Sequence, residues 1–351
     1  MVLITSSTEV GMSGVLVATA SAAPREVPPN APELSYAGGV AIDVNAERAR
    51  FDRVLNAGSG FQYDAPGTRI IFRTDATSVT ARFRTNGLHT RRDAVNGVGV
   101  VVVDGKKSST YKVEDPDSGV LIVLLWDSID STMRDMEIWL PYGESVDFLG
   151  LTVNETAQVL PAPQKAKPRY LAYGDSITHG FRATDVAATY PTLVAQARDW
   201  ELINLGFGSR QATADDGRII GSVPADIITI LIGFNDHYGN KPLDRYRADV
   251  TGIVQNIRAS QPKTPIFLIT PLWSTEPFPT TLGLHLEDYR QVLREITADA
   301  KDSNLHIIEG GDLIPSDARF FTDGVHPNDD GFRSLTEKLA PRLHLNPPPK
   351  P

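Results

Sequence analysis

The sequence contains a serine, a histidine and an aspartate that together could make the serine hydroxyl a nucleophile. They are Ser176, His326 and Asp323. A serine hydroxyl is a poor nucleophile at neutral pH and needs a base that takes its proton as it attacks a carbonyl carbon. His326 is our candidate base, because its imidazole is neutral near pH 7 and can return the proton to a departing alcohol. Asp323 stands three residues earlier, across a turn at Gly324, and can accept the other ring N–H. The pattern predicts acyl transfer through Ser176.

Acyl transfer also requires hydrogen-bond donors aimed at the oxygen that becomes negative. The candidates are the backbone N–H of Ser176, a backbone N–H in the loop 206–209 and the side-chain amide of Asn235. A backbone donor of this loop survives replacement of the side chain that carries it. These residues predict an oxyanion hole made of Ser176, the loop 206–209 and Asn235.

Each of these features also has an ordinary structural explanation. Asp and Ser are preferred helix N-caps, so Asp175 and Ser176 could simply begin a helix, and Asp323 and His326 could form a structural turn. The catalytic interpretation is favoured because four such polar segments follow the ends of predicted strands. Further residues near these ends are candidates to contact substrate, namely Asp175, Phe207, Ser209, Phe234, His237 and Trp273. No His-Glu-x-x-His motif occurs, so neither a metal nor a cofactor is predicted.

Strands that alternate with helices must position these side chains. The apolar run from Tyr170 to Tyr173 lacks alternation, as expected of a parallel strand buried on both faces, and Gly174 lets the chain turn after it. Further strands are predicted at 201–205, 226–232, 265–270 and 305–309, and helices at 189–200, 243–260, 286–302 and 329–343. This order predicts an α/β domain over 169–345, a three-layer, doubly wound, parallel five-stranded sheet whose sites lie at the carboxyl ends of the strands.

The part of the chain before this α/β domain has a different sequence pattern. Between 36 and 160, short β-rich runs are bounded by turn residues, which predicts an all-β sandwich or jelly roll. The Asp104-Gly105 pair between strand-like segments predicts a hairpin turn. Proline-rich segments suggest a linker at 161–168 and a tail at 346–351, and we assign 1–35 to an N-terminal segment with a linker at its end.

Composition excludes some partners and leaves localisation open. The formal charge of -9 and the lack of a Lys/Arg cluster argue against nucleic acid. No run of about 20 apolar residues that could span a bilayer is present. Residues 10–22 are small and apolar and end in Ala20-Ser21-Ala22, which resembles a signal-peptidase site, but Met1–Glu9 contains no Lys or Arg. Secretion is therefore an expectation beside a cytoplasmic alternative.

Four ordered segments resemble the blocks of the SGNH hydrolase superfamily, the GDSL-type esterases and lipases. They are Gly174-Asp175-Ser176, Asn204 to Ser209, Gly233-Phe234-Asn235-Asp236 and Asp323-Gly324-Val325-His326-Pro327. A β-sandwich before such a domain is similar to carbohydrate esterase family two. The resemblance implies a serine esterase that removes short-chain acyl groups, acetyl above all, from carbohydrates or small-molecule esters. In this superfamily the second segment supplies a glycine N–H to the oxyanion hole, which implies Gly208 as the donor of the loop, with Ser209 as the alternative. A lipase or aryl esterase of broader specificity is the first alternative, and a catalytically idle glycan-binding protein is the second.

Overall fold

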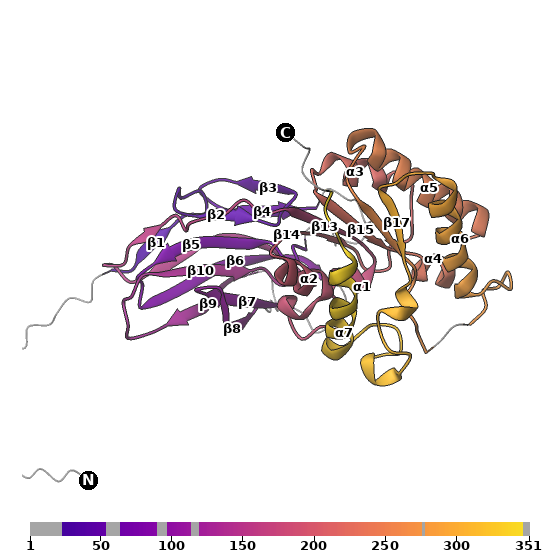
Figure 1. Cartoon of the computed structure of the whole chain (residues 1–351). Helices are drawn as coiled ribbons and strands as arrows, with labels where there is room; N and C mark the ends of the chain where they lie inside the picture. Colours follow the sequence, from indigo (N-terminus) through magenta and orange to yellow (C-terminus); the bar gives the residue numbers. More distant parts are fainter. Residues whose placement is uncertain (1–22, 54–63, 90–96, 114–118, 276–277, 347–351) are drawn as a thin grey trace, which may run out of the picture.

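The computed structural model describes residues 23–53, 64–89, 97–113, 119–275 and 278–346. The signal-like segment up to Ala22 and tail residues 347–351 lie outside these ranges. Figure 1 shows two domains in contact, an all-β domain from the first part of the chain and an α/β domain from the second.

The all-β domain consists of two antiparallel sheets packed face to face. The first has the order β3 (Ala41–Val44), β4 (Ala49–Asp52), β11 (Glu144–Val153), β6 (Ser78–His89) and β9 (Val120–Asp127), with β1 (Arg25–Val27) also on β11. The second has the order β12 (Val159–Leu160), β5 (Arg69–Thr74), β10 (Arg134–Trp139), β7 (Val98–Val103) and β8 (Lys106–Lys112), with β2 (Ser35–Ala37) on β5. Buried apolar side chains such as Phe72, Phe83 and Phe148 fill the space between them. The predicted sandwich is confirmed.

Two local features of this domain bear on the predictions. The Asp104-Gly105 hairpin is present between β7 and β8, with φ of 50° and 76° at its two residues. The end of the N-terminal segment, where we expect a linker, forms strands in the structure. β1 pairs with β11 and buries Val27, and β2 begins at Ser35. These strands could not be predicted from the sequence, because each is too short to show an alternating pattern and the surrounding sequence is rich in proline.

The α/β domain contains a parallel sheet with the strand order β14-β13-β15-β16-β17. These strands are β13 (Arg169–Gly174), β14 (Glu201–Gly206), β15 (Ile227–Leu231), β16 (Ile266–Ile269) and β17 (Leu305–Ile308). The helices are α1 (Ser176–His179), α2 (Tyr190–Arg198), α3 (Asp216–Ser222), α4 (Phe234–Tyr238), α5 (Leu243–Ser260), α6 (Leu286–Asp299) and α7 (Asp329–Leu339), with 3₁₀ turns at Val186–Ala188, Gly310–Asp312, Ala318–Phe320 and Ala340–Arg342. The predicted doubly wound sheet is confirmed, and α1, α3 and α4 are helices outside the four predicted ranges.

Helices cover both faces of this sheet, as the apolar sequence of β13 requires. Tyr170 and Ala172 face the core beneath α2 and α7, whereas Leu171 and Tyr173 face the core beneath α3, α5 and α6. All four side chains are fully buried. Successive residues of a strand point to opposite faces, so an uninterrupted apolar run is what a sheet between two helical layers needs.

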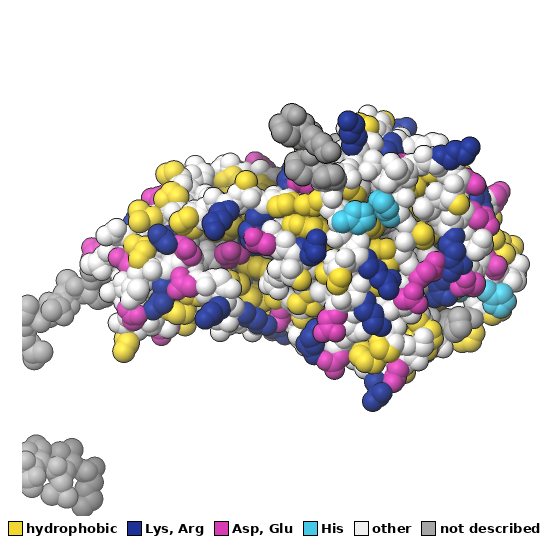
Figure 2. All heavy atoms as spheres, viewed as in Figure 1, with side chains coloured by type: hydrophobic (Ala, Val, Ile, Leu, Met, Phe, Trp, Pro, Cys, Tyr) yellow, Lys and Arg dark blue, Asp and Glu magenta, His cyan; other side chains and the backbone are white. Residues whose placement is uncertain are grey.

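Beside the separate core of each domain, one buried apolar cluster spans both domains and is called the shared core. Val100, Trp139 and Tyr142 of the sandwich belong to the same buried cluster as Trp200 and Leu202 of the α/β domain. Figure 2 shows that positive and negative side chains are interspersed over the visible face of both domains. In the described part of the chain, no helix has the length and apolarity that crossing a membrane demands.

Candidate active site

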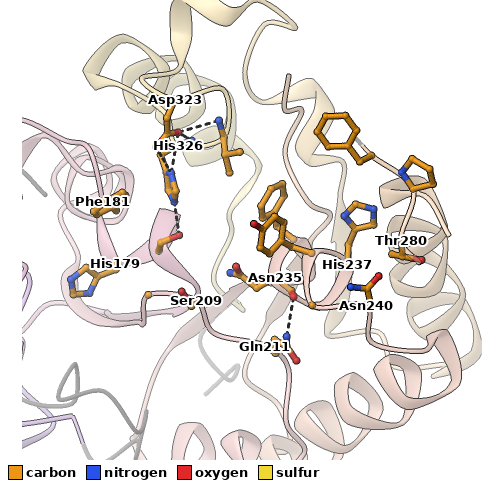
Figure 3. A pocket seen from close by; sticks show the side chains of 18 of the residues that line it. His179, Phe181, Ser209, Gln211, Asn235, His237, Asn240, Thr280, Asp323 and His326 are labelled. Atoms are coloured by element: carbon orange, nitrogen blue, oxygen red, sulfur yellow. Dashed lines mark hydrogen bonds and ion pairs between the residues drawn. The ribbon is translucent and has the colours of Figure 1, made fainter. Parts of the chain in front are cut away.

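The segments after β13, β14 and β15 and the loop before α7 meet around one cavity. Its volume is about 750 Å³, and Ser176, Gly208, Asn235, Asp323 and His326 all line it. Figure 3 shows Ser209, Asn235 and His326 around the same space, although they come from segments far apart in the sequence. A parallel sheet brings the carboxyl ends of its strands to one edge, which is why these segments converge.

Ser176, His326 and Asp323 form a continuous line of hydrogen bonds. The Ser176 Oγ lies 2.8 Å from His326 Nε2. The other ring nitrogen, Nδ1, lies 2.9 Å from Asp323 Oδ2 and 3.1 Å from Oδ1. A carboxylate can only accept, so Nδ1 carries the proton and Nε2 is left to accept the serine proton. This is the arrangement that general-base activation of a serine requires.

The loop around Asp323 holds its carboxylate in the ionised form. Burial by itself raises the pKa of Asp323, but hydrogen bonds from the ring and backbone of His326 and from the backbone of Val325 outweigh it and place the pKa well below the usual range. The two backbone N–H groups donate to Oδ1 at 2.9 Å and 3.2 Å. Arg182 Nε adds a contact of 3.3 Å to Oδ2. The aspartate is therefore fixed in position and charge beneath the imidazole.

Asp175 is the N-cap of α1, a role that the sequence allowed for either Asp175 or Ser176. Its Oδ1 accepts a 3.0 Å hydrogen bond from the Ile177 N–H at the start of α1, which leaves Ser176 to face His326. Its Oδ2 accepts from Asn235 Nδ2 at 3.3 Å. Burial raises the pKa of Asp175 to about 6, with the hydrogen bonds and His326 acting in the opposite direction. Asp175 thus links the helix that bears the serine to the amide of Asn235.

The candidate oxyanion donors lie in two short segments. Asn235 is on α4, directly after β15 and Gly233, and Asp236 anchors this segment by accepting the Ala212 N–H at 3.0 Å. Gly208 and Ser209 lie in a turn closed by a 3.1 Å hydrogen bond from the Arg210 N–H to the Phe207 carbonyl. Ser209 has a φ of 60°, the left-handed value that the third residue of a type II turn requires. Both turn residues line the cavity, so the choice between their N–H groups stays a prediction.

The structure separates the other predicted substrate-contacting residues into two groups. Ser209, Phe234 and His237 line the cavity. Phe207 does not, because its ring is fully buried beneath a guanidinium 4.0 Å away. Asp175 and Trp273 line a small separate cavity instead of this one, since the first is a helix cap and the second packs on Phe321.

Several cavity residues were not predicted from the sequence. Phe181 packs edge-on against His326 with a centroid distance of 4.7 Å. Tyr142 and Gly143 come from the sandwich, and the segment 278–281 forms part of the wall. Short loops without motif residues carry no sequence signal for such contacts. Among the described residues, no group of three or more His, Cys, Asp or Glu side chains could hold a metal ion.

Comparison with known proteins gives a family match in the second domain. Residues 172–333 match the GDSL-like Lipase/Acylhydrolase family. A search of curated proteins returns no match to the chain.

Solved structures with the same two-domain fold are numerous. A salicylyl-acyltransferase from a tetracycline biosynthetic pathway is 24% identical, with a TM-score of 0.76 over 90% of this chain and 95% of that one. A GDSL-like lipase structure from Bacteroides ovatus is 18% identical, with a TM-score of 0.78 over 91% and 97%. A family two carbohydrate esterase from Clostridium thermocellum, solved with cellohexaose, is 14% identical, with a TM-score of 0.69 over 88% and 97%. At these identities the likeness establishes the shared fold.

Proposed function

Because residues 172–333 match the GDSL-like Lipase/Acylhydrolase family, we propose that this protein is a serine esterase that removes acetyl and other short acyl groups from carbohydrates. The observation that carries the proposal is the line of hydrogen bonds from Ser176 through His326 to Asp323, open to a cavity of about 750 Å³. The fold shared with family two carbohydrate esterases supports a sugar as the alcohol component.

The reaction proceeds in two steps on these side chains. His326 Nε2 takes the proton of Ser176 as Oγ bonds to the ester carbonyl carbon, and the carbonyl oxygen becomes negative between its N–H donors. The tetrahedral intermediate collapses as His326 gives the proton to the departing sugar oxygen, which leaves the acyl group on Ser176. Water then repeats the sequence, with its proton passing to His326 and then to Ser176, and the carboxylic acid is released.

The cavity wall supports a substrate with both apolar and hydroxyl-bearing faces. Tyr238 and Phe278 line the cavity and are 77% and 67% exposed, so their rings are available to contact a bound molecule. Gln211, Asn240 and Thr280 add polar groups to the same wall. Aromatic rings beside hydrogen-bonding groups suit a pyranose, which has apolar faces and a polar rim.

The first test is turnover of p-nitrophenyl acetate by the wild type and by Ser176→Ala. We expect the variant to lose at least about 10³-fold in kcat, because no other group replaces the nucleophile. Undiminished turnover by the folded variant would reject the serine mechanism. Labelling of the wild type, but not of the variant, by an active-serine phosphonate provides a check that needs no turnover.

The second test concerns the substrate. Acetylated oligosaccharides should be deacetylated, and p-nitrophenyl esters should lose rate beyond butyrate. A preference for long chains or aryl groups would favour a lipase or aryl esterase. Acyl transfer to an added alcohol in preference to water would favour an acyltransferase, the activity named for one protein with the same fold. Binding to a glycan array without phosphonate labelling would favour a glycan-binding protein.

A further inference from the structure

The carbonyl of Gly206 accepts hydrogen bonds from both domains. Gly206 is the last residue of β14 and immediately precedes the turn that contains Gly208. His179 Nδ1 of the α/β domain lies 3.1 Å from the carbonyl oxygen. Arg53, which follows β4 of the sandwich, donates to the same oxygen from Nη1 at 2.5 Å. The strand end that leads into the candidate oxyanion loop is therefore held in part by the other domain.

Arg53 also supports the next residue of the loop. Its guanidinium carbon lies 4.0 Å from the centre of the Phe207 ring, a cation–π distance. The side chain is only 4% exposed. Burial lowers the pKa of Arg53 to about 10, opposed by the charges of Asp64 and Asp52, so the group stays charged at neutral pH. A buried charge in this place acts on the loop at two consecutive residues.

Residues of the sandwich also surround the imidazole that makes the second contact to Gly206. Asp64 is fully buried, and its Oδ2 lies 3.4 Å from Nε2 of His179. Ser145 donates to the other carboxylate oxygen of Asp64 at 2.8 Å. The ring of Tyr142 packs edge-on against the imidazole at a centroid distance of 5.8 Å. Arg53 thus contacts the Gly206 carbonyl directly, and Asp64 lies beside the imidazole of His179 that makes the second contact.

This arrangement is costly for a contact that only joins two domains. Removing charged groups from water costs several kcal/mol per ion before their attraction offsets it, and apolar residues of similar volume often serve as well. The two domains already share an apolar core. The backbone of α1 also packs closely on Gly206, because a Cβ built there would lie 2.1 Å from the backbone nitrogen of His179. The polar cluster instead fixes the direction in which the chain leaves β14.

We propose that Arg53 of the sandwich domain is a positioning residue for ester cleavage, which holds the Gly206 carbonyl so that the following turn presents the Gly208 N–H to the oxyanion. The inference rests on the proposed function, because it assigns the turn a role in that reaction. Arg53 does not touch the substrate in this scheme. It acts through the backbone of Gly206 and the ring of Phe207, so its effect belongs to the transition state and not to ground-state binding.

Arg53→Met in the full-length protein tests the role, with Lys107→Met as the matched control. Lys107 also joins the domains, through a 2.5 Å ion pair with Asp185, which is a residue outside the loop 206–210. We expect Arg53→Met to lower kcat about 10- to 100-fold on p-nitrophenyl acetate with KM changed less than about threefold, since a misdirected donor loses part of the ~10²–10³-fold effect of a deleted one. Lys107→Met should stay within about threefold of the wild type in both constants.

Hydrogen exchange of the peptide that covers 206–210 supplies a readout that does not depend on activity. We expect faster exchange in Arg53→Met and wild-type exchange in Lys107→Met. If the wild type turns over no ester and ignores the phosphonate while this exchange pattern holds, the proposed function fails and the bracing of the loop stands.

Other outcomes overturn the positioning role. They are wild-type kcat in folded Arg53→Met, equal losses in both variants, a loss confined to KM, or unchanged exchange of the loop. If Arg53→Met does not fold, Arg53→Lys decides, because the shorter side chain keeps the charge and weakens the hold on Gly206. It should then lower kcat at least about threefold and accelerate exchange, and wild-type behaviour in both measurements would reject the proposal.

Discussion

At the scale of single residues, the side-chain amide of Asn235 has two N–H groups, and we expect each of them to have a different task. One group donates to Asp175 Oδ2 at 3.3 Å, and an amide nitrogen carries a second hydrogen for another acceptor. Asn235 and Ser176 line the same cavity, so the second N–H is the candidate donor to the oxyanion. The bond to Asp175 fixes the orientation of the amide before substrate arrives, and preorganisation of this kind gives oxyanion donors their large effect.

We therefore expect Asn235→Ala to lower kcat about 10²–10³-fold and to leave KM nearly unchanged, because the donor acts on a charge that exists only in the transition state. Steady-state kinetics on p-nitrophenyl acetate measures this. Asn240→Ala is the control, since its amide lines the same cavity but its Oδ1 accepts from the Thr281 N–H at 2.6 Å. Equal losses in the two variants would contradict the assignment.

At the scale of elements, the loop 323–327 depends on a glycine. Gly324 has a φ of 82°, and a Cβ there would lie 2.0 Å from Thr275 Oγ1. Thr275 cannot simply turn away, because its N–H and hydroxyl both donate to the Gly324 carbonyl, at 2.8 Å and 3.3 Å. The loop that carries both Asp323 and His326 is thus held in place at Gly324.

Gly324→Ala should destabilise the protein by about 1–2 kcal/mol and lower kcat about 10²-fold, because left-handed φ is strained for alanine and displaced catalytic groups lose alignment. Gly105→Ala is a matched control, with a φ of 76° and no atom within 4 Å of its Cβ. It should share the stability cost and keep wild-type kcat. Urea unfolding and kinetics of the two variants measure these effects, and unimpaired turnover by Gly324→Ala would show that the loop tolerates the shift.

Most elements could be predicted from the sequence because their apolar residues follow a clear period. The helix α3 could not, since Gly217 and Gly221 weaken any helical pattern. The structure explains both glycines by close packing on α5, because a Cβ would lie 2.3 Å from the Ile253 carbonyl oxygen at Gly217 and 3.1 Å from the Asn256 carbonyl oxygen at Gly221. Gly174 was predicted for its backbone freedom, whereas the structure shows a packing need, with a Cβ 2.4 Å from the Leu231 carbonyl oxygen. Close approach between elements leaves no local pattern.

The residues of the candidate site also fall into those that the sequence predicts and those that it does not. Ser176, Asn235 and His326 could be proposed together because each follows a predicted strand or precedes a predicted helix, and parallel strands end at one edge. Arg53 and Asp64 could not, because they reach the site through the packing of another domain. Sequence patterns report the period of an element and its ends, and they do not report which element of a second domain lies against it.

At the scale of the whole molecule, the shared core makes the two domains one cooperative unit. Val100, Trp139 and Tyr142 pack with Trp200 and Leu202 across the boundary, and the buried polar cluster at Gly206 adds to this seam. We expect one transition in scanning calorimetry, with a calorimetric enthalpy equal to the van't Hoff enthalpy, because neither side can unfold without exposing the other. Two resolved transitions would show independent domains.

The position of the tryptophans in this seam gives the protein an optical signal of its own. Trp139 and Trp200 are two of its four tryptophans, and they are 8% and 6% exposed in the shared core. If the domains separated while each kept its secondary structure, both indoles would be exposed to water and their fluorescence emission would move to longer wavelength. Intrinsic fluorescence therefore reports whether the two halves of the chain are joined, without any label.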